Sequence, residues 1–428
     1  REQRAWATYD WANSAFQCTI ITAVFPIYFT SVASKGLPEA TATEHFATAT
    51  TIALTIIAVL SPVLGAYADY AGAKKRLLAV FLAIGVVTTA AMYFIGEGEW
   101  KFAAVLFIIA NIGVSGSFVF YDSLLPHIAR GDEMDRVSSA GYALGYLGGG
   151  LLLAVNLAWI LKPAWFGLSD AGVATRLSFV SVAIWWLGFS IPMFRRVPEP
   201  AVRATDLPAG MGPVSASFRQ LGATVRELTR YREAFLMLVA FLIYNDGIGT
   251  IIRMAAPYGA EMGLPDGALI GSLLMVQFVG IPCAFLFGMV AGRIGAKRAL
   301  YIALAVYIGI TIAAYFMRTV IHFFILSMMV GTVMGGAQAL SRSLFATMIP
   351  RHRSSEFFGF FGVFEKFAGT FGPGLFAVVI SATGSGRNAI LSLIPFFIAG
   401  AWLLSLVDVE AGQRAAREAE SRAARAPA

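Results

Sequence analysis

The sequence predicts an all-α integral membrane protein with twelve transmembrane helices in two bundles of six. Three observations support this prediction: the composition, the spacing of apolar segments, and a motif that recurs about half a chain later. Of the 428 residues, 58% are hydrophobic and 13% are charged, whereas soluble domains carry about 25% charged residues. Such a chain cannot cover its surface with polar groups in water, so we place it in a bilayer.

Apolar windows long enough to cross a bilayer, about 20 residues each, fall into two groups. The first group lies at 6–33, 46–69, 77–96, 101–128, 138–161 and 175–195. The second group lies at 233–258, 267–292, 299–318, 321–349, 356–382 and 388–407. We therefore predict an N-terminal bundle at 1–197, a central loop at 198–232, a C-terminal bundle at 233–408 and a solvated tail at 409–428.

Lysine and arginine are distributed unequally among the predicted loops. One set of loops, which includes the central loop and both termini, carries most of them, among which are Lys74, Lys75, Arg76, Arg130, Arg136, Arg293, Lys297 and Arg298. Cationic loops stay in the cytoplasm, so we expect both termini there. The net charge of +7 is then explained by the cationic cytoplasmic loops and does not indicate nucleic-acid binding. We expect a multi-pass protein of a bacterial inner membrane.

Patterns of catalytic residues are absent from the sequence. The two cysteines, Cys18 and Cys283, lie in separate apolar windows, which predicts neither a disulfide framework nor a metal site. The four histidines lie near window ends, and no phosphate-binding Gly-Lys-Ser/Thr loop or Ser/His/Asp set of suitable spacing occurs. We expect no enzyme activity, no cofactor and no metal.

A motif at the end of the second window recurs at the end of the eighth. The segment GAYADYAGAKKRL at 65–77 aligns with GMVAGRIGAKRAL at 288–300, an offset of 223 residues, and six positions are identical. The two copies lie at equivalent points of the two groups of windows. Parallel repeats related by an axis along the membrane normal are the construction of major facilitator transporters.

The first copy of the motif holds a carboxylate, Asp69, beside three cations at a helix end. Its two glycines permit a tight turn and a close approach of helices. Asp69 has two candidate partners, Arg76 and the N-terminus of a facing helix, and either would latch the two halves together on the cytoplasmic side. Alternatively, the cations only set the topology. The second copy has Gly292 in place of the carboxylate. The gating residues that we predict here are Gly65, Asp69, Gly72, Lys74, Lys75 and Arg76.

The pattern Gly-x-x-x-Asp-x-x-Gly-x-Lys-Lys at 65–75 resembles the loop motif of the major facilitator superfamily. Three further segments, YDWANSAF at 9–16, FYDSLLPHIA at 120–129 and DRVSSAGYALGYLGGGLLL at 135–153, resemble its vacuolar-effluxer-like branch, which is named for a fungal autophagy-related vacuolar amino-acid exporter. The resemblance implies twelve helices, alternating access and export of amino acids. Asp122 stands where this branch leads us to expect asparagine, so the chain carries an additional carboxylate.

Ionisable side chains within a span cost about 2.5–3.5 kcal/mol or more and require a partner or water. Asp10, Asn13 and Gln17 share one helical face, which predicts a polar stripe that lines a substrate cavity. Asp10 is alternatively a gate residue or a carboxylate at a helix start. We assign Asp122 to gating, as a partner for Arg76 or another loop cation.

Span ten carries Gln338 and Arg342, four residues apart. A buried arginine must meet water, a carboxylate or an anionic substrate group, and we assign Arg342 to contact with a substrate anion. The alternative is a fixed ion pair with Glu365 or Asp122. Glu365 and Lys366 point about 100° apart on one helix. We assign Glu365 to proton coupling, since a desolvated carboxyl group can carry a proton, and Lys366 to the substrate site or to pairing with Glu365.

The segment IYNDGIG at 243–249 places Asp246 about 18 Å deep in span seven, beside two glycines. Broken helices near the midplane bind substrate in transporters, so Asp246 is our preferred residue for a cation or a proton, with Asn245 beside it. Tyr146 and Gln277 are wall candidates, although close packing of small residues is the simpler explanation for the glycine-rich segment around Tyr146.

These observations together predict a secondary transporter that exports or exchanges a zwitterion such as an amino acid, with proton coupling as an option. One alternative is a transporter of an amphiphilic lipid or drug. Another is a transporter-like sensor or scaffold that moves nothing. The expected partners are a small-molecule substrate and membrane lipids, without nucleic acid, and we expect a monomer.

Overall fold

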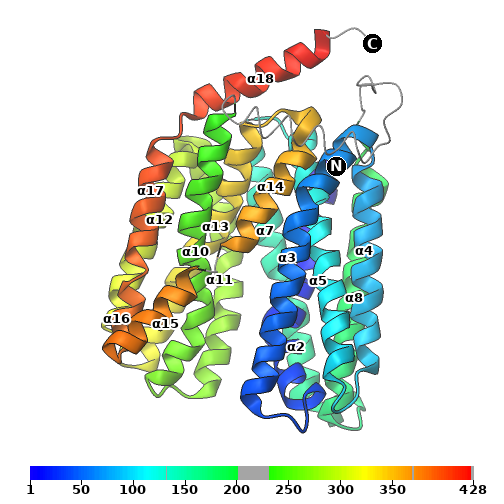
Figure 1. The fold of residues 1–428 in the computed structure, drawn as a ribbon, viewed down its shortest axis with the longest axis vertical. Coiled ribbons are helices and arrows are strands. Elements are labelled where there is room, and N and C mark those ends of the chain that lie inside the picture. The colour runs from blue at the N-terminus through cyan, green and yellow to red at the C-terminus, as the bar shows by residue number, and fades with distance from the viewer. Residues whose placement is uncertain (132, 201–230, 369–370, 426–428) are drawn as a thin grey trace.

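The computed structural model describes residues 1–131, 133–200, 231–368 and 371–425. Throughout these residues the regular secondary structure is helical, and eleven segments are long and apolar enough to cross a membrane. The predicted all-α membrane architecture is therefore confirmed. The N-terminus and the last helix, α18, lie at the same end of the bundle, which we call the terminal end (Figure 1). The opposite end is the far end.

The first half of the chain forms one group of helices around a long N-terminal segment. That segment is helical from Glu2 to Ala33 and contains π-helical turns at η1 (Gln17–Ala23) and η2 (Phe29–Ala33), on either side of α2 (Phe25–Tyr28). The remaining helices are α1 (Glu2–Phe16), α3 (Glu39–Ala71), α4 (Lys74–Ala91), α5 (Trp100–Ser123), α6 (Leu125–Ile128), α7 (Met134–Leu161) and α8 (Ala171–Arg196), with short 3₁₀ turns at η3 (Met92–Phe94) and η4 (Pro163–Phe166).

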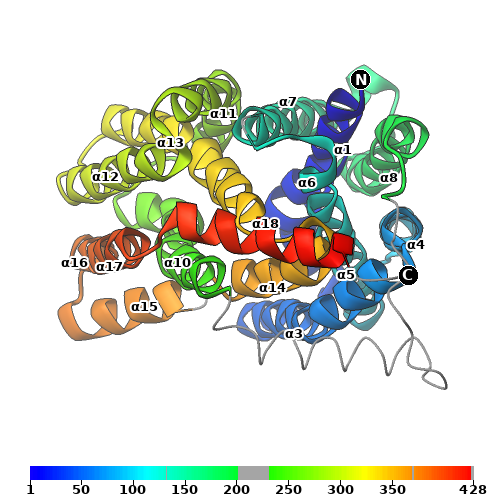
Figure 2. The same ribbon diagram turned by 90° about the horizontal axis from the view of Figure 1, so that it is seen from above.

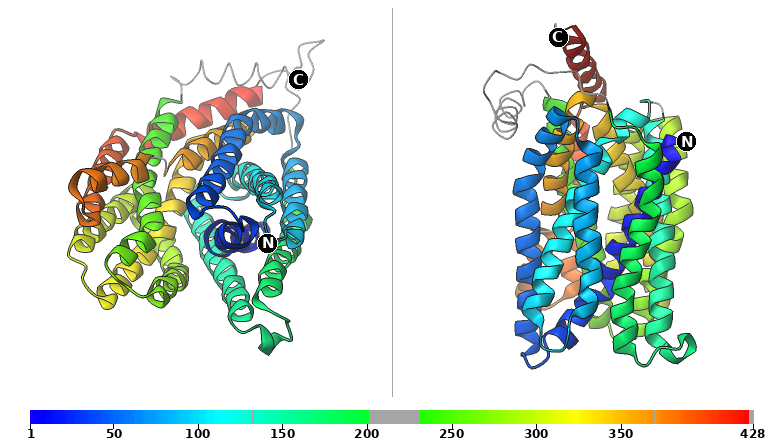
Figure 3. Two further views of the ribbon diagram at one scale, coloured as in Figure 1. Left: turned by 60° about the horizontal axis from the view of Figure 1, so that its bottom comes forward. Right: turned by 90° about the vertical axis from the view of Figure 1, so that its right-hand side faces the viewer.

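The second half forms the other group. Its helices are α10 (Arg232–Glu261), α11 (Asp266–Ile294), α12 (Ala296–Tyr315), α13 (Val320–Thr347), α14 (Ser354–Phe367), α15 (Phe371–Thr383), α16 (Gly386–Leu391) and α17 (Ile394–Ser405), with a 3₁₀ turn at η5 (Arg351–Arg353). The two groups stand side by side when the bundle is viewed from above (Figure 2) and obliquely from below (Figure 3, left). They meet along two lines, α3 against α14 and α7 against α11, which we call the first seam and the second seam.

The predicted window 356–382 contains two helices in place of one. The first, α14, ends at Phe367, and the backbone at Ala368 is extended, with φ −62° and ψ 131°. The second, α15, begins at Phe371 within the segment FGPG at 371–374, and glycine and proline are strong breakers of local structure. Each helix alone is shorter than a bilayer crossing, which is why eleven continuous spans are found where twelve windows were predicted.

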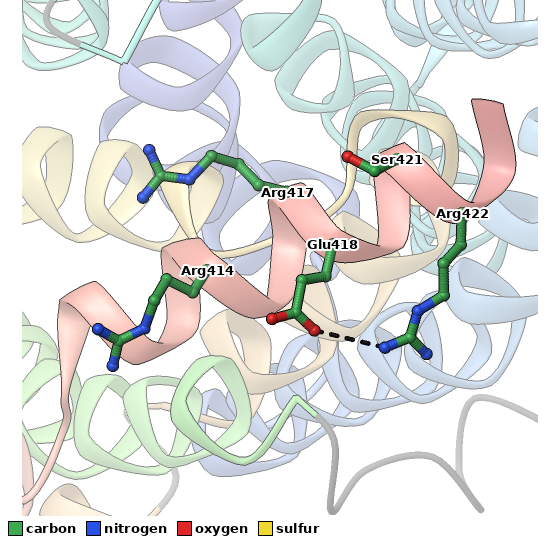
Figure 4. A pocket seen from close by; sticks show the side chains of 5 residues that line it. All are labelled: Arg414, Arg417, Glu418, Ser421 and Arg422. Atoms are coloured by element: carbon green, nitrogen blue, oxygen red, sulfur yellow. Dashed lines mark hydrogen bonds and ion pairs between the residues drawn. The ribbon is translucent and has the colours of Figure 1, made fainter. Parts of the chain in front are cut away.

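The C-terminal helix α18 (Val409–Arg425) lies across the terminal end of both halves (Figure 2). The predicted solvated tail is therefore only partly exposed. Its small-residue face packs on the protein, where Ala416 and Ala419 are buried, and the Arg351 N–H donates to the Glu420 carboxylate at 2.9 Å. Figure 4 shows its polar residues Arg414, Arg417, Glu418, Ser421 and Arg422.

Candidate functional site

A cavity of about 420 Å³ lies between the two halves. Its walls come from α1, η1, α5 and α7 on one side and from α10 to α14 and α16 on the other. The π-helical turns of η1 bring Gln17, Cys18, Thr22 and Ala23 to its wall, and π-turns within helices are frequent at functional sites. Nine residues singled out from the sequence line this cavity: Asp10, Asn13, Gln17, Asp122, Tyr146, Gln277, Gln338, Arg342 and Glu365.

The guanidinium group of Arg342, on α13, bridges the two halves of the molecule. Its Nη1 donates to the Asp122 carboxylate at 2.9 Å and its Nη2 to the Asp10 carboxylate at 3.3 Å. Its Nε donates to the Ser138 hydroxyl at 2.9 Å. All three nitrogens of Arg342 thus have protein partners, and the side chain is 2% exposed. The arrangement matches the alternative of a fixed ion pair with Asp122, and not the assigned contact with a substrate anion.

Aromatic rings complete the surroundings of Arg342. The guanidinium carbon lies 4.8 Å from the centroid of the Trp6 ring and 4.5 Å from that of Tyr142, distances at which a cation is attracted to a ring face. The Tyr121 hydroxyl donates to the Asp10 carboxylate at 2.8 Å. A cluster of one cation and two carboxylates therefore joins α1 and α5 of the first half to α13 of the second.

Sequence reasoning missed Trp6, Ser138 and Tyr142 as members of this cluster. Spacing was the available signal: Trp6 precedes Asp10 by four residues, and Tyr142 follows Ser138 by four, so each pair shares a helical face. Both pairs contact Arg342, which comes from another helix, α13, and spacing alone does not identify such a contact.

A second polar contact across the halves lies at the first seam. The Asp69 carboxylate, at the end of α3, accepts the backbone N–H groups of Ser355 at 3.1 Å and Glu356 at 2.8 Å, at the start of α14. The Lys74 ammonium lies 2.7 Å from the same carboxylate and donates to the Ser354 hydroxyl at 2.6 Å. A carboxylate at a helix N-terminus satisfies orphan N–H groups and interacts favourably with the helix dipole.

The structure decides between the two partners predicted for Asp69. The facing helix N-terminus is bound, whereas the Arg76 side chain is exposed. Gly72 turns the chain with φ +59°, and α4 begins two residues later. Lys74 therefore lies at the turn beside Asp69, while Arg76 lies about 200° further round the helix.

The glycine at the start of the motif allows the first seam to close. A Cβ atom added at Gly65 would overlap the Ser355 carbonyl group, so α3 and α14 approach backbone to backbone there. Lys75 has a different role within the first half, because its ammonium donates to the Phe194 carbonyl at 3.0 Å near the end of α8.

Asp246 is not among the described residues that line the cavity, so its binding of the transported cation or proton stays a prediction. Its carboxylate accepts the N–H groups of Phe371 at 3.2 Å and Gly372 at 3.1 Å, and so binds the start of α15 to α10. Asn245 is buried beside it and is likewise not among the described residues that line the cavity. The side chain of Lys366 lies outside the described part of the structure.

Comparisons with known proteins agree with this architecture. The family model described as "Vacuole effluxer Atg22 like" matches residues 39–417. The chain is 37% identical over 419 residues to the uncharacterized MFS-type transporter YxiO of Bacillus subtilis (strain 168), covering 96% of this chain and 95% of the relative. It is 26% identical over 322 residues to autophagy-related protein 22 of Yarrowia lipolytica (strain CLIB 122 / E 150), covering 68% of this chain and 53% of the relative.

Solved structures show the same fold. The structure of the proton:xylose symporter XylE superimposes with a TM-score of 0.71 at 14% identity, covering 95% of both chains. A bacterial homologue of the iron transporter ferroportin superimposes with a TM-score of 0.64 at 14% identity, covering 97% of this chain and all of the other. The fold is that of the major facilitator superfamily, and the chain belongs to its vacuole effluxer Atg22-like family of transporters.

Proposed function

We propose that the protein exports or exchanges a small solute that carries an amine, such as an amino acid, by alternating access across a bacterial inner membrane. The observation that carries the proposal is the cavity between two halves that are joined at the terminal end by polar contacts. The distribution of cations in the loops favours a cytoplasmic location for the terminal end. The names of the relatives, a vacuole effluxer family and an MFS-type transporter, support movement of a solute across a membrane.

Two groups of contacts must separate before the terminal end can open. The Asp69 carboxylate must leave the start of α14, and the guanidinium of Arg342 must leave Asp10 and Asp122. The second separation exposes or neutralises buried charges, so it couples naturally to the arrival of a proton or a cationic group at the carboxylates. Glu365 lines the same cavity and stays our candidate for proton coupling.

The unpartnered amide of Asn13 favours a transporter over a transporter-like sensor. A sensor or scaffold would have a dry cavity with permanently satisfied polar groups. Arg342 fits that description, but the Asn13 side chain is 1% exposed and has no hydrogen-bond partner for either of its amide atoms among the described residues. A buried polar group without a partner costs about 1–3 kcal/mol, and a bound solute would offset that cost.

The test is exchange by the purified protein in liposomes. Vesicles loaded with unlabelled amino acids are diluted into labelled amino acids, with and without an imposed pH gradient. We expect counterflow of at least one amino acid above that of empty vesicles, and its loss in the Asp10→Asn/Asp122→Asn variant. Absence of any flux across the whole panel, with correctly folded protein, would contradict the proposal.

A further inference from the structure

We propose that the cavity recognises its substrate by a cationic amine and an apolar body, and that a carboxylate on the substrate contributes nothing to binding. This inference rests on the proposed function, because it assigns the chemical class of the solute that the same cavity carries.

Charged side chains of both signs line the cavity. Its described lining residues include three carboxylates, those of Asp10, Asp122 and Glu365, and one cation, Arg342. The nitrogens of Arg342 already donate to two of these carboxylates and to Ser138. Two carboxylates, those of Asp10 and Asp122, thus surround a single cation, and the negative charge that remains attracts an ammonium and repels an entering carboxylate.

The Asn13 amide lies one helical turn from Asp10 on the same face of α1. It lines the cavity, and its oxygen and nitrogen have no partner among the described residues. The Gln277 amide oxygen comes from the opposite half and likewise has no hydrogen-bond partner among the described residues. Both oxygens can accept N–H groups from a substrate ammonium. The Asn13 amide nitrogen is uncharged and does not offset the repulsion of a carboxylate by Asp10 and Asp122, which share one cation.

The remainder of the cavity wall is suited to an apolar substrate body. Beyond the polar residues the lining is largely aliphatic and aromatic, and it continues to residues near the far ends of α10, α12 and α13. A cavity of about 420 Å³ lies in the range that accepts drug-sized ligands. Representative apolar lining residues are Ile251, Val276, Ile310, Phe323, Leu326 and Val330.

A set of probes with one ring and different head groups tests the inference. Affinities of purified protein in nanodiscs are measured by calorimetry for phenylethylamine, phenylalaninamide, phenylalanine and 3-phenylpropionate. We expect the two compounds with only a cation to bind at least tenfold more tightly than phenylpropionate, and phenylalanine to bind no more tightly than phenylethylamine. Binding of phenylalanine without binding of phenylethylamine, or binding of none of the four, would overturn the inference.

Variants locate the amine within the cavity. We expect Asn13→Leu to weaken phenylethylamine binding about tenfold, with little change for Asn111→Leu, since Asn111 is a buried asparagine that is not among the described lining residues. Thermal unfolding verifies that both variants fold. Equal effects of the two substitutions would remove Asn13 from the recognition site.

The liposome experiment separates this inference from the proposed function. Flux of zwitterions that depends on their carboxylate would uphold transport and overturn recognition by the amine alone. Absence of flux for amino acids and amines alike would overturn the proposed function itself.

Discussion

The two seams at the terminal end begin from the same motif and are built differently. At the first seam a Cβ atom at Gly65 would overlap the Ser355 carbonyl, and at the second a Cβ atom at Gly288 would lie 2.7 Å from the Cβ atom of Ser139. The repeated glycine therefore brings α3 close to α14 and α11 close to α7. Close approach of helices is the property that both copies of the motif share.

The polar parts of the two copies have diverged. In the first copy, Asp69 and Lys74 bind the start of α14 in the opposite half. In the second copy Gly292 replaces the carboxylate, and Lys297 donates to the Val407 carbonyl at 2.7 Å within its own half. The glycines therefore provide the contact at both seams, whereas the carboxylate of Asp69 converts one of the two contacts into a polar latch between the halves.

Loss of the cluster around Arg342 should reduce stability and transport more than loss of any contact at either seam. Arg342→Ala leaves Asp10 and Asp122 buried without their cation, and breaking a buried pair costs about 3–5 kcal/mol. We expect a marked fall in the thermal unfolding temperature and loss of transport. The exposed residue Arg293 supplies the control Arg293→Ala.

The cause of that destabilisation can be verified by rescue. Adding Asp10→Asn and Asp122→Asn to Arg342→Ala removes the unpaired charges, so stability should recover in large part while transport stays lost. A triple variant no more stable than Arg342→Ala would show that the cost does not come from unpaired charge.

Removal of the latch carboxylate should have the next largest effect. Asp69→Ala removes an ion pair and two charge-assisted hydrogen bonds, each of the latter worth about 1.5–3 kcal/mol, and leaves Lys74 buried. Ser355, at 0% exposure, provides a probe as Ser355→Cys in a Cys18→Ser/Cys283→Ser background. We expect its thiol labelling rate to rise tenfold or more.

A matched control for this variant lies at the start of α8. Asp170 accepts the Val173 N–H at 2.8 Å, so Asp170→Ala also removes a carboxylate from a helix N-terminus, but one within a single half. Labelling at Ser355→Cys should stay unchanged in Asp170→Ala. An equal rise in both variants would indicate general destabilisation and not release of the latch.

The glycines give a direct test of packing at the first seam. Gly65→Ala forces a Cβ atom against the α14 backbone, with an overpacking cost of about 1–3 kcal/mol. Gly292→Ala places its Cβ atom where no neighbouring atom lies within 4 Å among the described residues. We expect faster labelling of Ser355→Cys in the first variant only, and equal rates would argue against close approach at Gly65.

The smallest effect is expected for Lys297→Ala. Its hydrogen bond stabilises the end of α17 within one half, so we predict a loss of about 0.5–1.5 kcal/mol in stability and an unchanged labelling rate at the first seam. Lys74→Ala, in contrast, should accelerate labelling. Similar labelling rates in the two variants would remove the functional distinction between the two copies of the motif.

Much of the fold and part of the site could be predicted because their signals are local. The apolar windows, the repeated motif and the stripe of Asp10, Asn13 and Gln17 depend on composition and helical spacing alone. Hydropathy did not predict that the window 356–382 is divided into two helices, because α14 and α15 are both apolar. Only the segment FGPG indicates the break.

The partners of buried charges could not be predicted, because they depend on which helices meet. The cost of burying Arg342 predicted a partner, but the sequence could not choose among Asp122, Glu365 and a substrate. Asp246 was expected to face the cavity, yet the N-terminus that it binds exists only because the chain breaks before Phe371.

The central claim is that the two halves enclose the cavity and alternate by opening the latched terminal end. Spin labels at the exposed residues Arg76 and Arg298 report on that end, and labels at Lys162 and Arg318 report on the far end, all in the Cys18→Ser/Cys283→Ser background. Pulsed electron–electron double resonance then measures the distance between the labels of each pair, with and without Asp69→Asn. We expect the distance between the terminal labels to lengthen and the distance between the far labels to shorten in the variant. Two unchanged distances, or two distances that lengthen together, would contradict alternating access through this latch.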